Sequence, residues 1–442
     1  MKGMNKLKKL KRNKNKKSLR FSKKQTIGVL AACGLVLGGG IFASTNPAHQ
    51  MYASIVASQT VKADQASGSS TVLNLAKCGG EANNPNFDNG PIISKMIAQL
   101  PKDGGEIKIP AGDWYIKTPV NVNKSFVTIK GVNDGWRSGV DPANNNGAAN
   151  GGSHLVNNGG DTIDVKSADS HRLSGDEFQD FNITGSNSTG TGINVQSDND
   201  HITIEGMSFK NLKDPIVDKG ADCISITNNQ IAENKNGIAL TGASQQAKIS
   251  SNQLGSQPGG IAIALENPAS YNINDNLVYP DGSSNICLYN PVHGTIDGNT
   301  LSSYTNGIIN ILPNSKGQMG NANVISGNQL SVNSWKTGYG INVEGQQLVN
   351  DTKWGVIHVA GFRNLISDNN LEMNMPSNST GILVMAGDGN RISDDIIDGG
   401  HSSNNSRVVV NGKATNTIVS GTLQSNNSFQ NGNNSSNVNH TL

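Results

Sequence analysis

The chain repeats a short unit of the form Ile-x-x-Asn-x-(Leu/Ile/Val), in which apolar and polar positions alternate on either side of an asparagine. Short alternating stretches are typical of β-strands. A second alternating stretch lies between the copies and commonly opens on glycine, as in "GINV", "GIAL" and "GIAIAL". The leading isoleucine recurs every 22 to 24 residues, at Ile204, Ile226, Ile249, Ile273 and Ile296. A period of this length is typical of a solenoid whose coils bury their apolar faces against one another. The sequence therefore predicts an all-β fold, a right-handed single-stranded parallel β-helix.

The recurring asparagine is expected to be structural. At a buried corner its amide can bond to backbone groups and to the same side chain in the next coil, and asparagine tolerates left-handed backbone angles. The positions placed in one ladder by this reasoning are Asn229, Asn252, Asn276, Asn299, Asn328 and Asn369.

The two ends of the solenoid have their own patterns. Residues 87–105, "FDNGPIISKMIAQLPKDGG", predict a helix that caps the first coil, with Asp88 or Asn89 as its N-cap. The β-helix domain is placed at residues 73–423, after a linker at 64–72. Residues 424–442 are polar and are predicted to form a disordered tail.

Residues 1–63 are typical of a secretory signal peptide of the kind used by Gram-positive bacteria. Twelve Lys and Arg side chains precede an apolar run from Thr26 to Ala43, and "VKA" at 61–63 offers a cleavage site between small residues. Two alternatives remain: the run is retained as a membrane anchor, or Cys33 in "LAAC" marks a lipoprotein processing site. The prediction is a secreted protein, associated with the cell surface if the segment is retained.

Removal of this segment changes the charge of the chain. Residues 1–63 hold 13 of the 35 basic side chains and none of the 33 acidic ones, which leaves 22 basic side chains and a formal charge of −11. An acidic mature protein argues against a nucleic-acid or polyanion partner and favours a neutral substrate. Its three cysteines, Cys78, Cys223 and Cys287, are an odd number at wide spacing and are interpreted as buried thiols.

The stretch "KGADCISITNNQIAE" brackets a predicted strand with Asp222 and Glu233, eleven positions apart. Acids at such places are often ordinary solvated turn residues. A strand followed by a corner could instead place both carboxylates on one side of a single coil. Glycosidic chemistry uses such a pair, because one carboxyl protonates the leaving oxygen while the other acts on the attacking group or the anomeric carbon.

Several strings in the chain resemble known β-helix enzymes. "GGEIKIPAGDWYI" resembles the pectate-lyase-like superfamily in general. From Gly192 onward, "GINVQSDND", "IEGMSF", "KGADCISITNNQIAE", "LTGASQQAKISSNQL" and "ALENP" resemble the central coils of the inulin fructotransferases, glycoside hydrolase family 91. The similarity continues more weakly over about residues 73–423.

The resemblance implies a trimer with its active site between adjacent β-helices, acting on inulin without a metal or organic cofactor. The expected product is a difructose dianhydride, difructose anhydride III, formed when a hydroxyl of one fructosyl unit attacks C2 of its neighbour and expels the remaining chain. The family's essential carboxylates carry over to Asp222 and Glu233. We assign Glu233 to protonate the leaving oxygen and Asp222 to assist the attacking hydroxyl.

Polar residues in the neighbouring coils are candidates for binding the sugar. Turn structure explains Asn199 and Asp200 equally well, and Trp136 with Arg137 is either one wall of the cleft or a simple surface loop. The substrate-binding candidates are Gln196, Asp198 and Asp200 one coil earlier, Ser244 and Gln245 one coil later, and Trp136.

Three rival functions stay open at this point. The first is a difructose anhydride hydrolase that uses the same acids with water as nucleophile. Export disfavours it, because a ring of two sugars can be imported before it is cut. The second is a pectin-active enzyme, which needs basic residues or an Asp cluster for Ca²⁺. The third is a non-catalytic β-solenoid surface adhesin.

Overall fold

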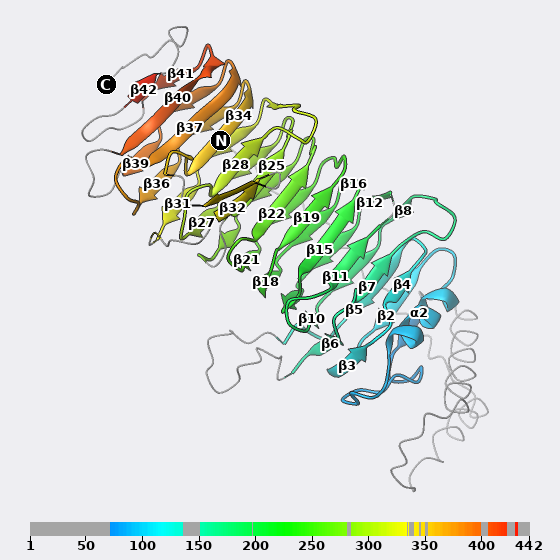
Figure 1. Cartoon of the computed structure of the whole chain (residues 1–442). Coiled ribbons are helices and arrows are strands. Elements are labelled where there is room, and N and C mark those ends of the chain that lie inside the picture. Colours follow the sequence, from blue (N-terminus) through cyan, green and yellow to red (C-terminus); the bar gives the residue numbers. More distant parts are fainter. Residues whose placement is uncertain are drawn as a thin grey trace, which may run out of the picture. The chain divides into compact units, whose positions relative to one another are not determined.

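The computed structural model describes residues 71–135, 151–196, 198–280, 284–333, 335, 340–343, 346–349, 352–398, 405–421 and 429–431. The strands of this part form three long sheets whose members alternate along the chain, so that one coil contributes one strand to each sheet (Figure 1). Every described pairing is parallel except in one hairpin, β32 (Gly340–Val343) with β33 (Gln346–Val349). The predicted parallel β-helix is therefore confirmed.

Each of the three sheets adds its strands in the order of the coils. The first has 13 strands: β1 (Val72–Asn74), β2 (Gly105–Lys108), β5 (Val127–Lys130), β9 (Glu177–Gln179), β13 (Thr203–Glu205), β17 (Ser225–Thr227), β20 (Lys248–Ser250), β23 (Asn272–Asn274), β26 (Thr295–Asp297), β30 (Val324–Ser326), β35 (Leu365–Ser367), β38 (Arg391–Ser393) and β41 (Ile418–Ser420). The second has 11: β3 (Gly112–Ile116), β6 (Ser153–Asn157), β10 (Asn182–Thr184), β14 (Ser208–Lys210), β18 (Gln230–Asn234), β21 (Gln253–Ser256), β24 (Leu277–Val278), β27 (Thr300–Ser303), β31 (Gln329–Val332), β36 (Asn370–Met373) and β39 (Ile396–Asp398). The third has 13: β4 (Val120–Val122), β7 (Ile163–Val165), β11 (Thr191–Val195), β15 (Asp214–Lys219), β19 (Ile238–Thr241), β22 (Ile261–Glu266), β25 (Ser284–Tyr289), β28 (Ile309–Leu312), β34 (Ile357–Phe362), β37 (Thr380–Asp388), β40 (Ser406–Thr415) and β42 (Phe429–Asn431), with β29 (Gly320–Asn321) beside β34.

A short fourth sheet, the corner sheet, lies where the chain passes from the third sheet to the first. It consists of β8 (Leu173–Ser174), β12 (Asn199–Asp200) and β16 (Ala221–Asp222). Each coil in this region therefore runs from the third sheet through the corner sheet into the first and second sheets.

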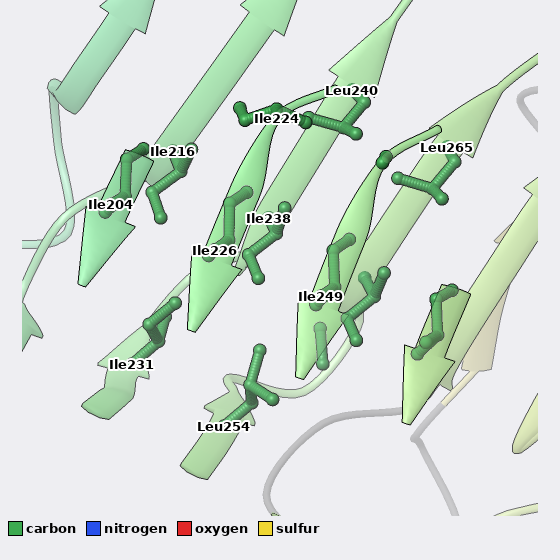
Figure 2. Close-up of a cluster of buried hydrophobic side chains, with 14 of the residues drawn as sticks. Ile204, Ile216, Ile224, Ile226, Ile231, Ile238, Leu240, Ile249, Leu254 and Leu265 are labelled. Atoms are coloured by element: carbon green, nitrogen blue, oxygen red, sulfur yellow. The ribbon is translucent and has the colours of Figure 1, made fainter. Parts of the chain in front are cut away.

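The core is built from the isoleucines of the repeat. Ile204, Ile226 and Ile249 pair in register on successive rungs of the first sheet, and all three side chains are fully buried. Figure 2 shows these side chains beside Ile231 and Leu254 of the second sheet and Ile238 of the third. Because neighbouring rungs lie about 4.8 Å apart, each apolar side chain packs on its equivalents above and below.

The predicted capping helix is present as α2 (Gly90–Gln99) and packs against β4. Ile93, Met96 and Ile97 form its buried face. Asn89 occupies the N-cap position without making a side-chain cap bond, and its amide donates to the carbonyl of Tyr115 instead. The first helical N–H, that of Gly90, is satisfied by the Asp88 carboxylate at 3.1 Å.

The structure describes part of the predicted C-terminal tail but none of the predicted signal peptide. The signal peptide at 1–63 and residues 64–70 of the linker lie outside the described residues, and β1 already begins at Val72. Within the stretch predicted as a disordered tail, Phe429–Asn431 forms β42, so that expectation is corrected for these residues. Their backbone pairs with β40 and satisfies hydrogen-bonding groups at the open end of the third sheet.

The prediction of buried cysteines is confirmed for two of the three. Cys78 and Cys287 are buried thiols as predicted, whereas Cys223 is only partly buried because it sits at a corner with its Sγ 3.0 Å from Gln246 Oε1. No helix in the described part of the chain is long and apolar enough to cross a membrane.

The predicted asparagine ladder is confirmed. Each amide nitrogen donates to the amide oxygen of the next coil at 2.9 to 3.0 Å, and the same oxygen accepts the neighbouring backbone N–H. Each amide nitrogen also donates to an isoleucine carbonyl, as Asn252 does to Ile226. A second ladder, Asn323–Asn364–Asn390, was not predicted from the sequence. These bonds let a polar corner be buried without unsatisfied groups.

The first ladder ends on an acid rather than an amide. Asp395 Oδ1 accepts the Asn369 amide at 2.9 Å, while its buried Oδ2 has no hydrogen-bond partner among the described residues. By the ladder's pattern, Oδ2 stands where an amide nitrogen would donate to the carbonyl of Ile366. Burial raises the pKa of Asp395 from its ordinary value of 3.8 to about 7.

The ladder yields a stability prediction at its centre. Asn252→Leu removes the acceptor of two Asn229 N–H groups and the donor to Ile226, so unfolding should become easier by about 1 to 3 kcal/mol for each group left unsatisfied. The measurement is denaturant unfolding beside Asn272→Leu, an exposed asparagine on the same solenoid, which should stay near wild type. Equal stability of the two variants would contradict the role given to the ladder.

The acid at the end of the ladder yields a pH prediction. Between about pH 4 and 7 the folded chain holds the Asp395 proton that the unfolded chain has lost, so stability falls as pH rises. Asp395→Asn removes this cost, and it should stabilise the protein by up to about 4 kcal/mol above pH 7 and by progressively less toward pH 4. Thermal melts across this range test it. Stability of the variant should depend less steeply on pH than that of wild type. Part of the dependence remains, because burial also raises the pKa values of Asp176 and Asp218 to about 7. An unchanged dependence of stability on pH in the variant would refute the prediction.

Candidate active site

The corner sheet aligns polar residues on successive rungs. Ser174, Asp200 and Asp222 are direct register partners in β8, β12 and β16. A single parallel bridge continues the column from Asp222 to Gln245. Neighbouring rungs are about 4.8 Å apart, so Asp200, Asp222 and Gln245 form one short row along the edge. This is the stacking expected of these three candidates.

Arg172, which directly precedes β8, joins the carboxylates of this row. Its Nε and Nη2 donate to the two oxygens of Asp198, each at 3.0 Å. Nη1 donates to Asp200 at 3.3 Å and Nη2 also donates to Asp222 at 2.5 Å. One guanidinium therefore holds three carboxylates from the two following coils. We call Arg172, Asp198, Asp200 and Asp222 the corner cluster.

The corner cluster is accessible to solvent. The side chain of Asp198 is 62% exposed, that of Arg172 40%, and those of Asp200 and Asp222 23% and 22%. A hydrogen bond from Ser174 lowers the pKa of Asp200, with smaller contributions from His201 and Arg172. The carboxylates raise the pKa of Arg172 above its ordinary value, mainly through Asp198 and then Asp222. The site thus presents fixed hydrogen-bond acceptors around one permanent cation.

A buried pair supports the cluster from below. Asn199 Nδ2 donates to Asp218 Oδ1 at 2.6 Å, and both side chains are fully buried. Burial raises the pKa of Asp218 to about 7. Asn199 therefore has a structural role, whereas its neighbour Asp200 faces the surface.

Glu233 is presented at a different corner, between the second and third sheets. The register of β18 with β21 shifts between Ile231 and Asn234, which marks a β-bulge. Glu233 takes a left-handed backbone angle there, with φ of 59°, and its side chain is exposed. No side chain in the described part of the chain bonds to it. Bulges re-aim side chains in this way, and here the acid points out of the coil.

The structure corrects the expected geometry of the carboxylate pair. The segment between Asp222 and Glu233 is not one strand with a corner but two strands, β17 and β18, joined at Asn228 and Asn229. Asp222 follows the C-terminal end of β15, and Glu233 precedes the N-terminal end of the adjacent β19. The acids thus lie at opposite edges of the third sheet, separated by a six-residue strand, or about 20 Å. One coil does not bring them together.

The remaining candidates fall in different places. Gln196 donates to Asp164 at 3.0 Å on the third sheet, and Gln245 is exposed beside Asp222. Ser244 is buried, with its hydroxyl enclosed, so the structure does not place it at the surface where a sugar would bind. Trp136 and Arg137 lie outside the described residues.

Sequence reasoning missed Arg172. Arg172 lies directly before β8, 26 residues before Asp198 and 50 residues before Asp222. The coil period of 22 to 26 residues was the available signal, because Arg172 and Asp198 occupy equivalent places on adjacent rungs.

An exposed row of carboxylates and amides along one edge of a parallel β-helix defines a solenoid protein with a site suited to a hydroxyl-rich ligand. An inulin fructotransferase of Arthrobacter globiformis, named as DFA-I-forming, is 31% identical over 341 residues, which is 70% of this chain and 82% of the relative. The chain belongs to the inulin fructotransferase family.

Solved structures support the fold. DFA-IIIase from Arthrobacter chlorophenolicus A6 without its lid, in complex with GF2, superposes with a TM-score of 0.68 at 23% identity, covering 79% of this chain and 94% of that one. The catalytic unit of a GH87 α-1,3-glucanase from Streptomyces thermodiastaticus superposes with a TM-score of 0.51 at 14% identity, covering 85% of this chain and 70% of that one.

A family described as periplasmic copper-binding protein (NosD) matches residues 145–342, a span made largely of solenoid coils. The described residues contain no group of three or more His, Cys, Asp or Glu side chains arranged to hold a metal ion.

Proposed function

We propose that this protein converts inulin-type fructan into a difructose dianhydride by intramolecular fructosyl transfer. The observation that carries the proposal is the accessible Asp222 carboxylate, fixed in the corner cluster of a chain whose relative is named an inulin fructotransferase. Asp198, Asp200 and Gln245 offer acceptors and donors beside it for the hydroxyls of a fructosyl unit.

The chemistry needs one base and one acid. A hydroxyl of the terminal fructosyl unit attacks C2 of the second unit, and its proton passes to Asp222. The bond from that C2 to the oxygen of the remaining chain breaks, and Glu233 donates a proton to this oxygen. No water is consumed, and the attacking hydroxyl is already held close to its target. The hydroxyl that attacks decides the isomer: we expected difructose anhydride III, whereas the relative's name specifies DFA-I.

If Asp222 and Glu233 act as a pair, their separation of about 20 Å within one coil calls for a second chain. We propose a homotrimer in which the third sheet faces the threefold axis, so that Asp222 of one subunit meets Glu233 of the next. The middle of this sheet supports the arrangement, because Val217, Ala239 and Ala264 form a column of small, partly exposed apolar side chains on its outer face. Such a column permits close packing between copies.

The location of the protein is also a proposal. Residues 1–63 act as a secretory signal, and the mature chain works outside the cell or at its surface. Export suits a polymeric substrate, which cannot be imported before it is shortened. Nothing in the proposed chemistry requires nucleic acid, a cofactor or a membrane.

Assembly is tested with mixed subunits. Residues 64–442 should run as a trimer by light scattering. Asp222→Asn and Glu233→Gln chains, each inactive alone, should regain activity when they are unfolded together and reassembled. Each mixed trimer then contains one interface where an intact Asp222 faces an intact Glu233. A mixture that stays inactive, while wild-type chains regain activity under the same treatment, would contradict a pair formed between subunits.

The reaction is tested with the same two variants as pure proteins. Asp222→Asn and Glu233→Gln keep size but exchange no proton at neutral pH, so each should fold and assemble while turnover of inulin falls by about 10² to 10⁴. Chromatography of the wild-type products should show a difructose dianhydride with little free fructose.

Other products point to the rival functions. Free fructose as the main product would support hydrolysis with the same residues. No product from a folded trimer would favour a non-catalytic adhesin. Near-normal turnover by either amide variant would remove that residue from the mechanism.

A further inference from the structure

Arg172 differs from an ordinary surface arginine in the number and placement of its partners. It precedes the first strand of the corner sheet, and its guanidinium reaches the carboxylate of Asp222 two rungs away. It is the only side chain in the described part of the chain that bonds to Asp222. We propose that Arg172 is a positioning residue for the reaction, one that fixes Asp222 and turns one oxygen of this carboxylate toward the attacking hydroxyl. This inference rests on the proposed function.

Two hydrogen bonds to Asp198 fix the orientation of the Arg172 guanidinium. Nε and Nη2 grip both oxygens of Asp198 at 3.0 Å, which sets the plane of the group. Nη1 then meets Asp200 and the second Nη2 proton meets Asp222. A lysine carries one point charge and has no such fork. The arrangement therefore places Asp222 relative to two other coils.

The contact also divides the roles of the two Asp222 oxygens. A guanidinium only donates hydrogen bonds, so Oδ2 of Asp222 acts as an acceptor and is occupied. Oδ1 has no side-chain partner among the described residues and is left for the substrate. In the proposed step, Oδ1 takes the hydroxyl proton as the new oxygen–C2 bond forms and the old C2–oxygen bond breaks. Arg172 keeps its protons and forms no bond to the sugar.

The charges around Asp222 make this contact consequential. Without Arg172, three carboxylates would face one another on adjacent rungs. His201, whose Nδ1 lies 3.5 Å from Asp200 Oδ1, would be a neighbouring basic group. Asp222 would turn away from its neighbours, because like charges repel and nothing else holds its side chain. The third sheet and the core lie beneath and would keep their packing. The expected defect is thus one of geometry at the reacting carboxylate.

The experiment compares Arg172→Gln and Arg172→Lys with wild type on inulin. Misplacement of a reacting group by about 1 Å costs on the order of 10² in rate. We therefore expect kcat to fall by about 100-fold in Arg172→Gln, with a smaller loss in Arg172→Lys and little change in KM. Millimolar guanidinium should restore part of the kcat of Arg172→Ala. Arg363→Gln is the matched control, since Arg363 is an exposed arginine next to the same corner column and its Nε donates to Asn321 at 3.1 Å. This variant should keep wild-type kcat.

The possible outcomes distinguish a failure of the positioning role of Arg172 from a failure of the proposed function. Wild-type protein without activity on inulin would overturn the proposed function. Active wild type with normal kcat in folded Arg172→Gln would overturn the positioning role alone. A loss seen only in KM, or a kcat loss that neither lysine nor guanidinium relieves and that follows the melting temperature, would also overturn it. If Arg172→Gln does not assemble, Arg172→Lys and guanidinium rescue decide the question.

Discussion

The stacking of one coil on the next is the constraint on which the rest of this structure depends. Parallel backbone bonds hold the rungs together, but a solenoid must also bury the corners where its strands end. The asparagine ladder solves that problem, because each amide satisfies a backbone N–H, a carbonyl and the neighbouring amide at once. Its geometry repeats only if every coil keeps the same register. The ladder thus fixes where each surface residue lies as well as stabilising the core.

Because the register is fixed, residues at equivalent positions of successive coils line up in a row along the solenoid. Asp200 and Asp222 stand side by side because they occupy the same place in consecutive coils, although 22 residues separate them. Arg172 joins them through the same rule, since its place matches that of Asp198. Small shifts of register have equally definite effects. The bulge in β18 moves Glu233 out of the coil while Asn234 turns inward and bonds to Leu212.

This dependence on register explains what the sequence could and could not predict. The isoleucine and asparagine ladders were predictable, because identical residues at a regular period report directly on buried, repeated environments. The second ladder at Asn323 was missed, since its members lie one strand earlier and lack the flanking isoleucine pattern. Arg172 was missed because contacts between unlike residues leave no repeat. The separation of Asp222 and Glu233 was misjudged because a second strand, β18, follows the predicted corner at Asn228 and Asn229 and carries Glu233 to the opposite edge of the third sheet. Ser244 was misplaced for the related reason that alternation at a corner does not say which residue faces inward.

The same rigidity limits what one chain can do chemically. Residues along one edge are brought to within a rung of each other, but residues on opposite edges are held apart by the full width of a sheet. A β-helix therefore supplies dense, well-positioned rows such as the corner cluster and cannot fold them against one another. Symmetry offers a remedy: if equivalent sheets of several copies face a common axis, the edge of one meets the opposite edge of the next. In the proposed trimer, the Arg172–Asp222 contact would prepare one edge of the third sheet and the bulge that presents Glu233 would prepare the other, so that each edge suits the opposite edge of the next subunit.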